Sequence, residues 1–220
     1  MEVMAEGGRG GGDPATRHAL VGPPDLWEMK RRFQIDFLRQ AGLLPHHRLL
    51  DLGCGTLRGG IPLIGYLDPG HYAGVEVRRE VLDEGRRELG ESGLAEKSPQ
   101  LVHCPRIAEL DLGRRFDVAW AFAVLIHMDD AILDDAVAAM ARHLDDGGVF
   151  YATANVGSES PGEWQGFPVV HREAAFYADV FGRHGLALTD IGPLTSFGHH
   201  HPRLPPEAQA RQRMLKATKA

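Results

Sequence analysis

Hydrophobic positions along the chain fall into two patterns, which alternate from about residue 25 to the end. Short apolar runs bounded by turn residues predict buried strands at about 48–52, 71–77, 100–103, 116–122, 149–153, 186–191 and 211–218. Apolar residues at helical spacing predict helices at about 25–41, 79–89, 129–144 and 172–184, and another ending near residue 67. In the helix after residue 129, this spacing places Ile132, Ala136, Met140 and Leu144 on the buried face.

The alternation of strands and helices predicts an α/β fold. Parallel βαβ units place helices on both faces of one sheet. Such sheets bind ligands at the carboxyl ends of their strands, near the point where the strand order reverses. The distinctive residues of this sequence all fall at these strand ends, so we expect the functional site there.

Composition and charge restrict the number of domains, the cellular location and the partners that we expect. The chain has 220 residues, 43% hydrophobic and 25% charged, which fits one globular domain. We expect 1–24 to be a disordered Gly-rich leader and 25–220 a single domain. Without a signal peptide or an apolar run of about 18 residues, we expect a cytoplasmic protein with free Cys54 and Cys104 and no membrane partner. A net charge of −6 with scattered basic residues argues against a nucleic-acid partner.

A glycine-rich turn carries the strongest chemical signal. Asp51-Leu52-Gly53-Cys54-Gly55-Thr56 follows a predicted strand, and Glu76 closes the next one. Glycines let the backbone turn sharply and approach a ligand that side chains would exclude. An acidic residue about 20 positions downstream accepts hydrogen bonds from ribose hydroxyls. The pattern therefore predicts a site for a cofactor that contains adenosine.

The register of the glycines distinguishes two cofactors. A dinucleotide site has the spacing G-x-G-x-x-G, but Arg58 stands where the third glycine would fall. Asp51 also precedes the first glycine by two residues, which disfavours a diphosphate and suits an ammonium and a sulfonium. The charges therefore favour S-adenosylmethionine over NAD.

The segment 50–56 resembles the first motif of class I S-adenosylmethionine-dependent methyltransferases, and 74–77 resembles the second. The segment 116–128 is similar to their fourth-strand region, and 144–150 to the turn into their fifth strand. The resemblance covers 27–191. It implies a three-layer α/β/α Rossmann-like sandwich, with a seven-stranded, mostly parallel sheet and an antiparallel last strand. It also implies S-adenosylmethionine as cofactor and S-adenosylhomocysteine as product.

The resemblance also assigns roles to single residues. Asp51 would orient the cofactor ammonium, Glu76 would bind the ribose, and Val77 would lie beside the adenine. Arg58 would meet the methionine carboxylate. The cofactor-binding set that it implies is Gln34, Asp51, Gly53, Cys54, Gly55, Arg58, Glu76, Val77, Cys104 and Phe122. The third-strand segment 103–106 departs from the family pattern, since a polar side chain usually contacts the adenine there.

Histidines and one loop supply further candidates. His127 follows the fourth strand, either as a general base or as a packing residue. The run His199-His200-His201 is a poor metal site, because adjacent residues of an extended segment point to alternate sides. One of these three histidines is expected to contact substrate. The loop 155–168 contains Trp164 and Phe167 and forms either a substrate lid or a surface loop pinned by its aromatic residues.

These observations predict an enzyme that methylates an oxygen, nitrogen or carbon of a small molecule by in-line displacement. The alternatives are a non-catalytic module that binds S-adenosylmethionine and, less favoured, a NAD-dependent oxidoreductase. The segment after the fourth strand is Phe122-Ala123-Val124-Leu125 rather than Asn/Asp-Pro-Pro-Tyr/Phe, which favours a metabolite acceptor. The sequence does not indicate the acceptor, the methylated atom or the oligomeric state.

Overall fold

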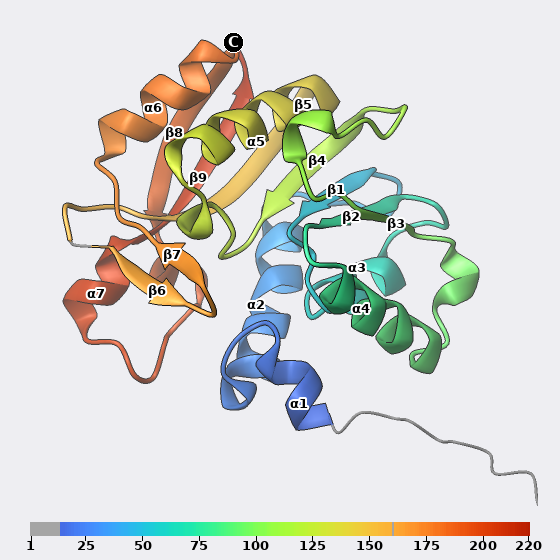
Figure 1. Cartoon of the computed structure of the whole chain (residues 1–220). Coiled ribbons are helices and arrows are strands. Elements are labelled where there is room, and N and C mark those ends of the chain that lie inside the picture. The colour runs from blue at the N-terminus through green and yellow to red at the C-terminus, as the bar shows by residue number, and fades with distance from the viewer. Residues whose placement is uncertain (1–13, 160) are drawn as a thin grey trace, which may run out of the picture.

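The computed structural model describes residues 14–159 and 161–220, which form one mixed sheet with helices on both faces (Figure 1). The first 13 residues of the predicted leader lie outside the described residues. Residues 14–24, also assigned to that leader, form helix α1 (Pro14–Ala19) and the turn that leads into a 3-10 helix at Pro24–Leu26. Within the described residues, no helix combines the length and the hydropathy needed to cross a membrane.

The sheet has seven strands in the order β3-β2-β1-β4-β5-β9-β8. Its strands are β1 (Leu49–Leu52), β2 (Tyr72–Glu76), β3 (Gln100–His103), β4 (Phe116–Ala121), β5 (Leu144–Asn155), β8 (Leu186–Pro193) and β9 (Gln212–Lys219). All pairs from β3 to β5 are parallel, whereas β9 runs antiparallel to both of its neighbours. This confirms the predicted seven-stranded Rossmann-like sheet with an antiparallel last strand.

Helices cover the two faces of the sheet around two apolar cores. They are α2 (Trp27–Gln40), α3 (Gly60–Tyr66), α4 (Arg79–Glu91), α5 (Asp130–His143), α6 (Ala174–Arg183) and α7 (Pro206–Arg211). One core joins α2, α3 and α4 to the sheet, and the other joins α5 and α6. Strand β4 serves both, because successive side chains of a strand point to opposite faces. Val118 and Trp120 enter the first core, and Ala119 and Ala121 the second.

Helix α5 buries most of the face predicted from its apolar spacing. Asp129 caps its first turn by accepting a hydrogen bond from the backbone N–H of Ile132. Ala136, Met140 and Leu144 of the predicted face are buried, whereas Ile132 is 45% exposed, so its predicted place was wrong. The buried stripe contains Leu133, Val137 and Met140, because these residues pack onto β4 and β5 once the cap has set the helix start.

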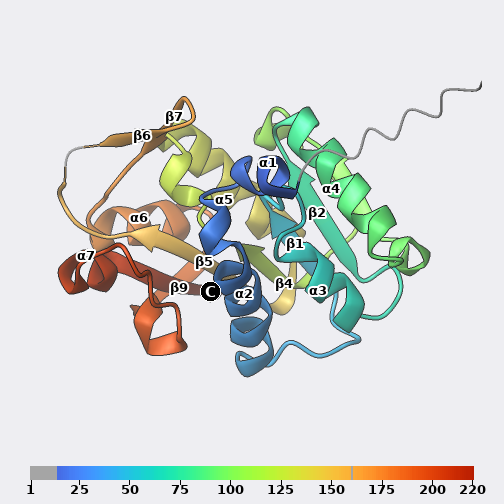
Figure 2. The same ribbon diagram turned by 90° about the horizontal axis from the view of Figure 1, so that it is seen from below.

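A short hairpin lies outside the main sheet. Strands β6 (Gly162–Trp164) and β7 (Phe167–Val169) pair antiparallel within the predicted 155–168 loop. In Figure 2, helix α1 lies between this hairpin and α4. The hairpin and the N-terminal segment therefore both reach the edge of the sheet where the parallel strands end.

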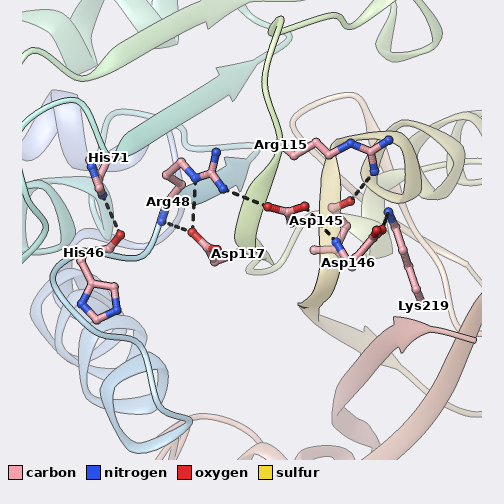
Figure 3. Close-up of polar contacts among 9 residues, drawn as sticks. His46, Arg48, His71, Arg115, Asp117, Asp145, Asp146 and Lys219 are labelled. Atoms are coloured by element: carbon pink, nitrogen blue, oxygen red, sulfur yellow. Dashed lines mark hydrogen bonds and ion pairs between the residues drawn. The ribbon is translucent and has the colours of Figure 1, made fainter.

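Ion pairs join neighbouring strands at the other end of the sheet, where β1, β4 and β5 begin (Figure 3). Asp117 accepts hydrogen bonds from the backbone N–H of Arg48 at 2.7 Å and from its guanidinium at 3.4 Å. Arg48 also binds Asp145 at 2.9 Å, and Lys219 binds Asp146 at 3.0 Å. Partial burial opposes ionisation of Asp117, but the contacts with Arg48 outweigh it and lower the pKa of this carboxyl. These contacts hold the starts of β1, β4 and β5 in register.

Candidate active site

The turn after β1 brings the backbone close to its neighbours. Gly53 and Gly55 have φ angles of 69° and 59°, in the left-handed region that favours glycine. The N–H groups of Gly53 and Cys54 donate to the carbonyl of Val75 at 2.8 and 3.1 Å, which fixes the turn against β2. A Cβ on Gly53 would clash with Val124, and one on Gly55 would lie 2.8 Å from Val21. Only glycine fits at these two positions.

Glu76 ends β2 and reaches back to this turn. One carboxylate oxygen accepts from the N–H of Gly55 at 3.0 Å, and the other accepts from the N–H of Arg78 at 3.0 Å. The residue is only 5% exposed and lines a cavity beside the turn. Each carboxylate oxygen has a further lone pair, so Glu76 retains acceptor capacity for a ligand.

Asp51 lies beneath the turn, at 3% exposure. Its carboxyl accepts a hydrogen bond from the hydroxyl of Tyr72 at 2.6 Å. Burial raises the pKa of Asp51 to about 7; the bond from Tyr72 and the charge of Arg58 oppose this rise, and the charge of Glu76 adds to it. Asp51 is therefore poised to titrate near neutral pH.

The cavity has a volume of about 530 Å³, within the range of small-molecule sites. It extends from the ends of β1, β2 and β4 to the β6–β7 hairpin on one side and to α2 on the other. Its lining contains Val21, Gly22, Pro23, Lys30, Gly53, Gly55, Arg58, Glu76, Val77, Arg78, Phe122, Ala123, Val124, Ile126, His127, Glu163, Trp164, Phe167, Val169, His201 and Leu204.

His127 lies between β4 and the hairpin. Its Nδ1 lies 2.8 Å from the carbonyl oxygen of Pro168, and its ring packs 5.3 Å from that of Trp164 and 6.3 Å from that of Phe167. A carbonyl only accepts, so Nδ1 carries the hydrogen and Nε2 keeps a lone pair. Burial lowers the pKa of His127, against the effect of the Pro168 contact. At neutral pH the ring is therefore a neutral acceptor at the cavity wall.

The segment 17–25, here called the N-terminal strap, crosses the cavity. Arg17 anchors it through ion pairs with Glu84, Glu88 and Glu91 of α4 at 2.5, 2.6 and 2.7 Å. Beyond this anchor, its backbone carbonyls accept from the side chains of three segments far apart in sequence. These bonds are Gln165 to Ala19 at 2.9 Å, Arg78 to Leu20 at 3.1 Å and Arg58 to Val21 at 2.8 Å.

Comparison with known families identifies this arrangement. Residues 50–150, which contain the glycine turn, Glu76 and His127, match the model of a methyltransferase domain. This match shows a methyltransferase domain within the chain. It supports the prediction, made from the motifs, of an S-adenosylmethionine-dependent methyltransferase.

Solved methyltransferase structures share the fold. Magnesium protoporphyrin IX methyltransferase from Synechocystis PCC 6803, with bound S-adenosylhomocysteine, superposes with a TM-score of 0.66 at 17% identity, covering 90% of this chain and 85% of that one. The CcbJ methyltransferase from Streptomyces caelestis gives 0.65 at 19% identity, covering 90% and 97%. The glycopeptide N-methyltransferase MtfA, with S-adenosylmethionine, gives 0.65 at 16% identity, covering 86% and 94%. No curated protein sequence matches the chain.

Most of the predicted site residues meet at the cavity of the methyltransferase. They are Gly53, Gly55, Arg58, Glu76, Val77, Phe122 and His127. Asp51 lies directly below, hydrogen-bonded to Tyr72. Trp164 and Phe167, predicted in a loop at this edge, line the cavity from the β6–β7 hairpin.

Besides Asp51, three predicted residues are not among the described residues that line the cavity. Gln34 accepts from the indole N–H of Trp120 at 3.1 Å and donates to the carbonyl of Lys30 at 3.1 Å, so it fixes α2 against β4. The thiol of Cys54 faces Gly74, where a Cβ would lie 2.9 Å from its Sγ. Cys104 lies beyond β3 with its thiol 3.2 Å from the carbonyl of Arg106. Both cysteines are free, as expected.

Other cavity residues carried no signal in the sequence. Gly22 belongs to the segment that was taken as a leader, and Lys30 to a helix predicted only from its apolar face. Of the three consecutive histidines, His201 lines the cavity, His199 is buried and His200 is exposed. Lys30 precedes Arg31 and Arg32, so nothing in the local sequence distinguishes it from the two basic residues beside it.

The raised pKa of Asp51 predicts a pH dependence of stability. The unfolded chain releases this proton near pH 4, but the folded protein retains it to about pH 7. Stability contributed by this group is thus present below pH 4 and declines as the pH rises to 7, at up to about 1.4 kcal/mol per pH unit. Urea unfolding of the wild type and Asp51→Asn between pH 4 and 8 measures it. Parallel pH profiles for the two proteins would contradict the prediction.

The ion pairs of Arg17 predict a second effect, on the rate of ligand release. Replacing Arg17 with glutamine leaves three carboxylates of α4 without their shared cation, which weakens the attachment of the strap. We expect bound S-adenosylhomocysteine to dissociate about 10-fold faster, equivalent to about 1.4 kcal/mol. Stopped-flow tryptophan fluorescence measures the rate, since Trp27 stacks on His18 of the strap at 3.7 Å. The control is Arg86→Gln, which removes an exposed ion pair of the same helix; equal rates in both variants would contradict the prediction.

Proposed function

We propose that this methyltransferase transfers the methyl group of S-adenosylmethionine to an oxygen, nitrogen or carbon of a small acceptor held in the 530 Å³ cavity. One observation carries the proposal: the glycine turn with Glu76 and the wall of His127, Trp164 and Phe167 line the same cavity. A donor site and an acceptor site thus share one cavity, as in-line transfer requires.

The residues around the glycine turn fit the cofactor. Glu76 would accept from the ribose hydroxyls, and Val77 would lie against the adenine. Asp51 would pair with the ammonium, directly or through water, and Arg58 with the carboxylate. Gly53 and Gly55 line the cavity with backbone alone, in a turn that a Cβ would not allow. When bound, S-adenosylmethionine supplies an electrophilic methyl group on a sulfonium.

His127 is proposed as the general base. Its Nδ1–H is held by the carbonyl of Pro168, which leaves Nε2 to accept a proton from an acceptor hydroxyl or amine. Trp164 and Phe167 would hold an apolar part of the acceptor beside it and limit the access of water. Phe122 would form the floor below the transferred group.

A small acceptor is supported by the volume of the cavity and by the segment after β4. Phe122-Ala123-Val124-Leu125 has no Asn or Asp followed by two prolines that would hold a planar amine. Among proteins of this fold, one is named for a porphyrin and another for a glycopeptide. The acceptor here is proposed to be a metabolite.

Calorimetric titration with S-adenosylmethionine, S-adenosylhomocysteine and NADH tests the cofactor. We expect micromolar binding of the two sulfur compounds and none of NADH. Formation of S-adenosylhomocysteine with a panel of metabolites then tests turnover. Binding of NADH alone, or of no compound, would overturn the proposed function, whereas tight binding without turnover would indicate a non-catalytic module.

Replacing His127 with glutamine is expected to lower kcat by about 100-fold, the lower end of general-base effects. The wild-type rate should fall below the lowered pKa of His127, on the acid side of 6.5, because the protonated ring cannot accept a proton. The variant should lose this acid limb but keep its affinity for S-adenosylmethionine. His46→Gln is the matched control, because His46 is exposed and lies before β1, at the other end of the parallel strands. An unchanged kcat in the His127 variant would indicate catalysis by proximity alone.

A further inference from the structure

The α2 end of the cavity gathers cations. Lys30 of α2, Arg58 of the glycine turn and His201 of the loop before α7 all line it. A Cβ placed on Gly22 would lie 3.6 Å from Nη1 of Arg58 and 3.8 Å from Nζ of Lys30. Gly22 has a φ of 131°, so a side chain there would be strained, and these two contacts are of ordinary van der Waals length. The cavity beside Gly22 is thus bordered by two cations.

Carboxylates do not balance these cations. Among the described residues that line the cavity, the acidic ones are Glu76, which is bound to Arg78 and the glycine turn, and Glu163, which is exposed. Asp51 lies below Arg58, and its raised pKa leaves it partly protonated at neutral pH. Asp25 forms an ion pair with Arg203. In the part of the chain that the structure describes, Lys30 has no ion-pair partner.

The positive charges of this corner lower the pKa values of neighbouring basic groups. Burial and the charge of Arg58 lower the pKa of Lys30 to about 8, so most of it remains charged at neutral pH. Burial, and then Lys30 and His201, lower the pKa of His199 to about 4. His199 is 3% exposed, and among the described residues neither of its ring nitrogens has a hydrogen-bond partner. The charge of Lys30 also acts on His127, on the opposite wall.

The proposed cofactor does not neutralise this corner. Its methionine end carries an ammonium with its carboxylate, and its sulfonium adds a net positive charge. Its single carboxylate is assigned to Arg58, which lies against the glycine turn with its guanidinium 5.8 Å from the ring centre of Phe122. The loaded cavity would therefore hold an excess of positive charge around Lys30.

We propose that Lys30 and His201 bind a carboxylate of the methyl acceptor, so that the enzyme acts on an anionic metabolite whose methylated atom lies toward His127. This inference rests on the proposed function. The acceptor would span the cavity from the cationic corner to the aromatic wall of Trp164 and Phe167. Lys30 would then be a specificity-determining residue that contacts substrate.

The test uses benzoate and benzamide, which have the same shape but differ in charge. Protein saturated with S-adenosylhomocysteine is titrated with each compound by ligand-observed NMR. We expect benzoate to bind at least about 10-fold more tightly than benzamide, as one charge-assisted contact implies. Lys30→Met should reduce benzoate to the affinity of benzamide, and Lys30→Arg should retain the preference. The affinity for S-adenosylhomocysteine should stay within about 2-fold in both variants.

Arg32→Met is the matched control, because it removes one positive charge from the exposed side of the same helix. It should leave benzoate binding unchanged. Equal binding of benzoate and benzamide by the wild type would overturn the proposal. Loss of affinity for S-adenosylhomocysteine in Lys30→Met, with benzoate unaffected, would also overturn it and assign the corner to the cofactor carboxylate. Failure of the wild type to bind S-adenosylhomocysteine would instead overturn the proposed function.

Discussion

Replacing Glu76 with alanine is expected to lower the affinity for S-adenosylmethionine and S-adenosylhomocysteine by about 100-fold. The proposed role gives the carboxylate two ribose hydroxyls, and hydrogen bonds to a charged group contribute about 1.5–3 kcal/mol each. A net loss of about 3 kcal/mol corresponds to roughly 100-fold in Kd. Isothermal titration calorimetry measures the change.

Replacing Glu76 would also weaken cofactor binding indirectly, through the glycine turn that it holds. Its two oxygens also hold the N–H groups of Gly55 and Arg78, so alanine loosens the turn that approaches the cofactor. Glu76→Gln keeps the shape and one acceptor oxygen, and we expect it to lose about 10-fold, between the wild type and alanine.

Glu163→Ala is the control for Glu76, because it removes an exposed carboxylate from the rim of the same cavity. Its Kd should stay within about 2-fold of the wild type, since an exposed charge contributes little to binding. If Glu76→Ala also bound both compounds with wild-type affinity, the assignment of the ribose site would be wrong.

Replacing Gly53 with alanine is expected to destabilise the fold by about 2–5 kcal/mol. A residue with a Cβ costs about 1–2 kcal/mol in the left-handed region, where Gly53 has a φ of 69°. The added Cβ also clashes with Val124, and overpacking costs about 1–3 kcal/mol. Urea unfolding at fixed pH measures the change in the free energy of unfolding.

Two further variants separate the contributions at Gly53. Gly113 has a φ of 65° and open space around it, so Gly113→Ala should show only the conformational cost of about 1–2 kcal/mol. Val124→Ala in the Gly53→Ala background removes the clash. The double variant should be more stable than the sum of the single changes predicts, by about 1 kcal/mol or more. Strict additivity would show that Val124 does not restrict this turn.

Much of the fold was predictable because its signals are local. The apolar runs 71–77, 100–103 and 116–122 differ from the observed strands by no more than one residue at either end. The longer strand β5 begins at Leu144, five residues before its prediction, since the Gly147-Gly148 pair suggested a turn. Only Leu144 of this early segment pairs with β4; the register then shifts, and pairing resumes at Val149, where pairing with β9 also begins. Gly147 has a φ of 80°, so the two glycines form an irregular, unpaired stretch within the strand.

The candidate site also contains a part that the sequence predicts and a part that it does not. Asp51, the two glycines and Glu76 are joined by backbone contacts between adjacent strands, which a motif of fixed spacing encodes. Gln34 shows the limit of transferring a role from a resemblance. Its position on α2 suggested a cofactor contact, but its amide is taken up by Trp120 and Lys30.

The sequence by itself determined the α/β class, the glycine turn and its acidic partner, and through them the methyltransferase family. These depend on period, turn geometry and charge within short segments. Only the tertiary structure decided that the strap, the hairpin and the loop of His201 line one cavity, and that Lys30 lies in it beside Arg58. Gln165 and Ala19 are 146 positions apart yet hydrogen-bonded across it. Contacts between residues so far apart in sequence form only after the sheet has brought its strand ends together, so no local sequence pattern predicts them.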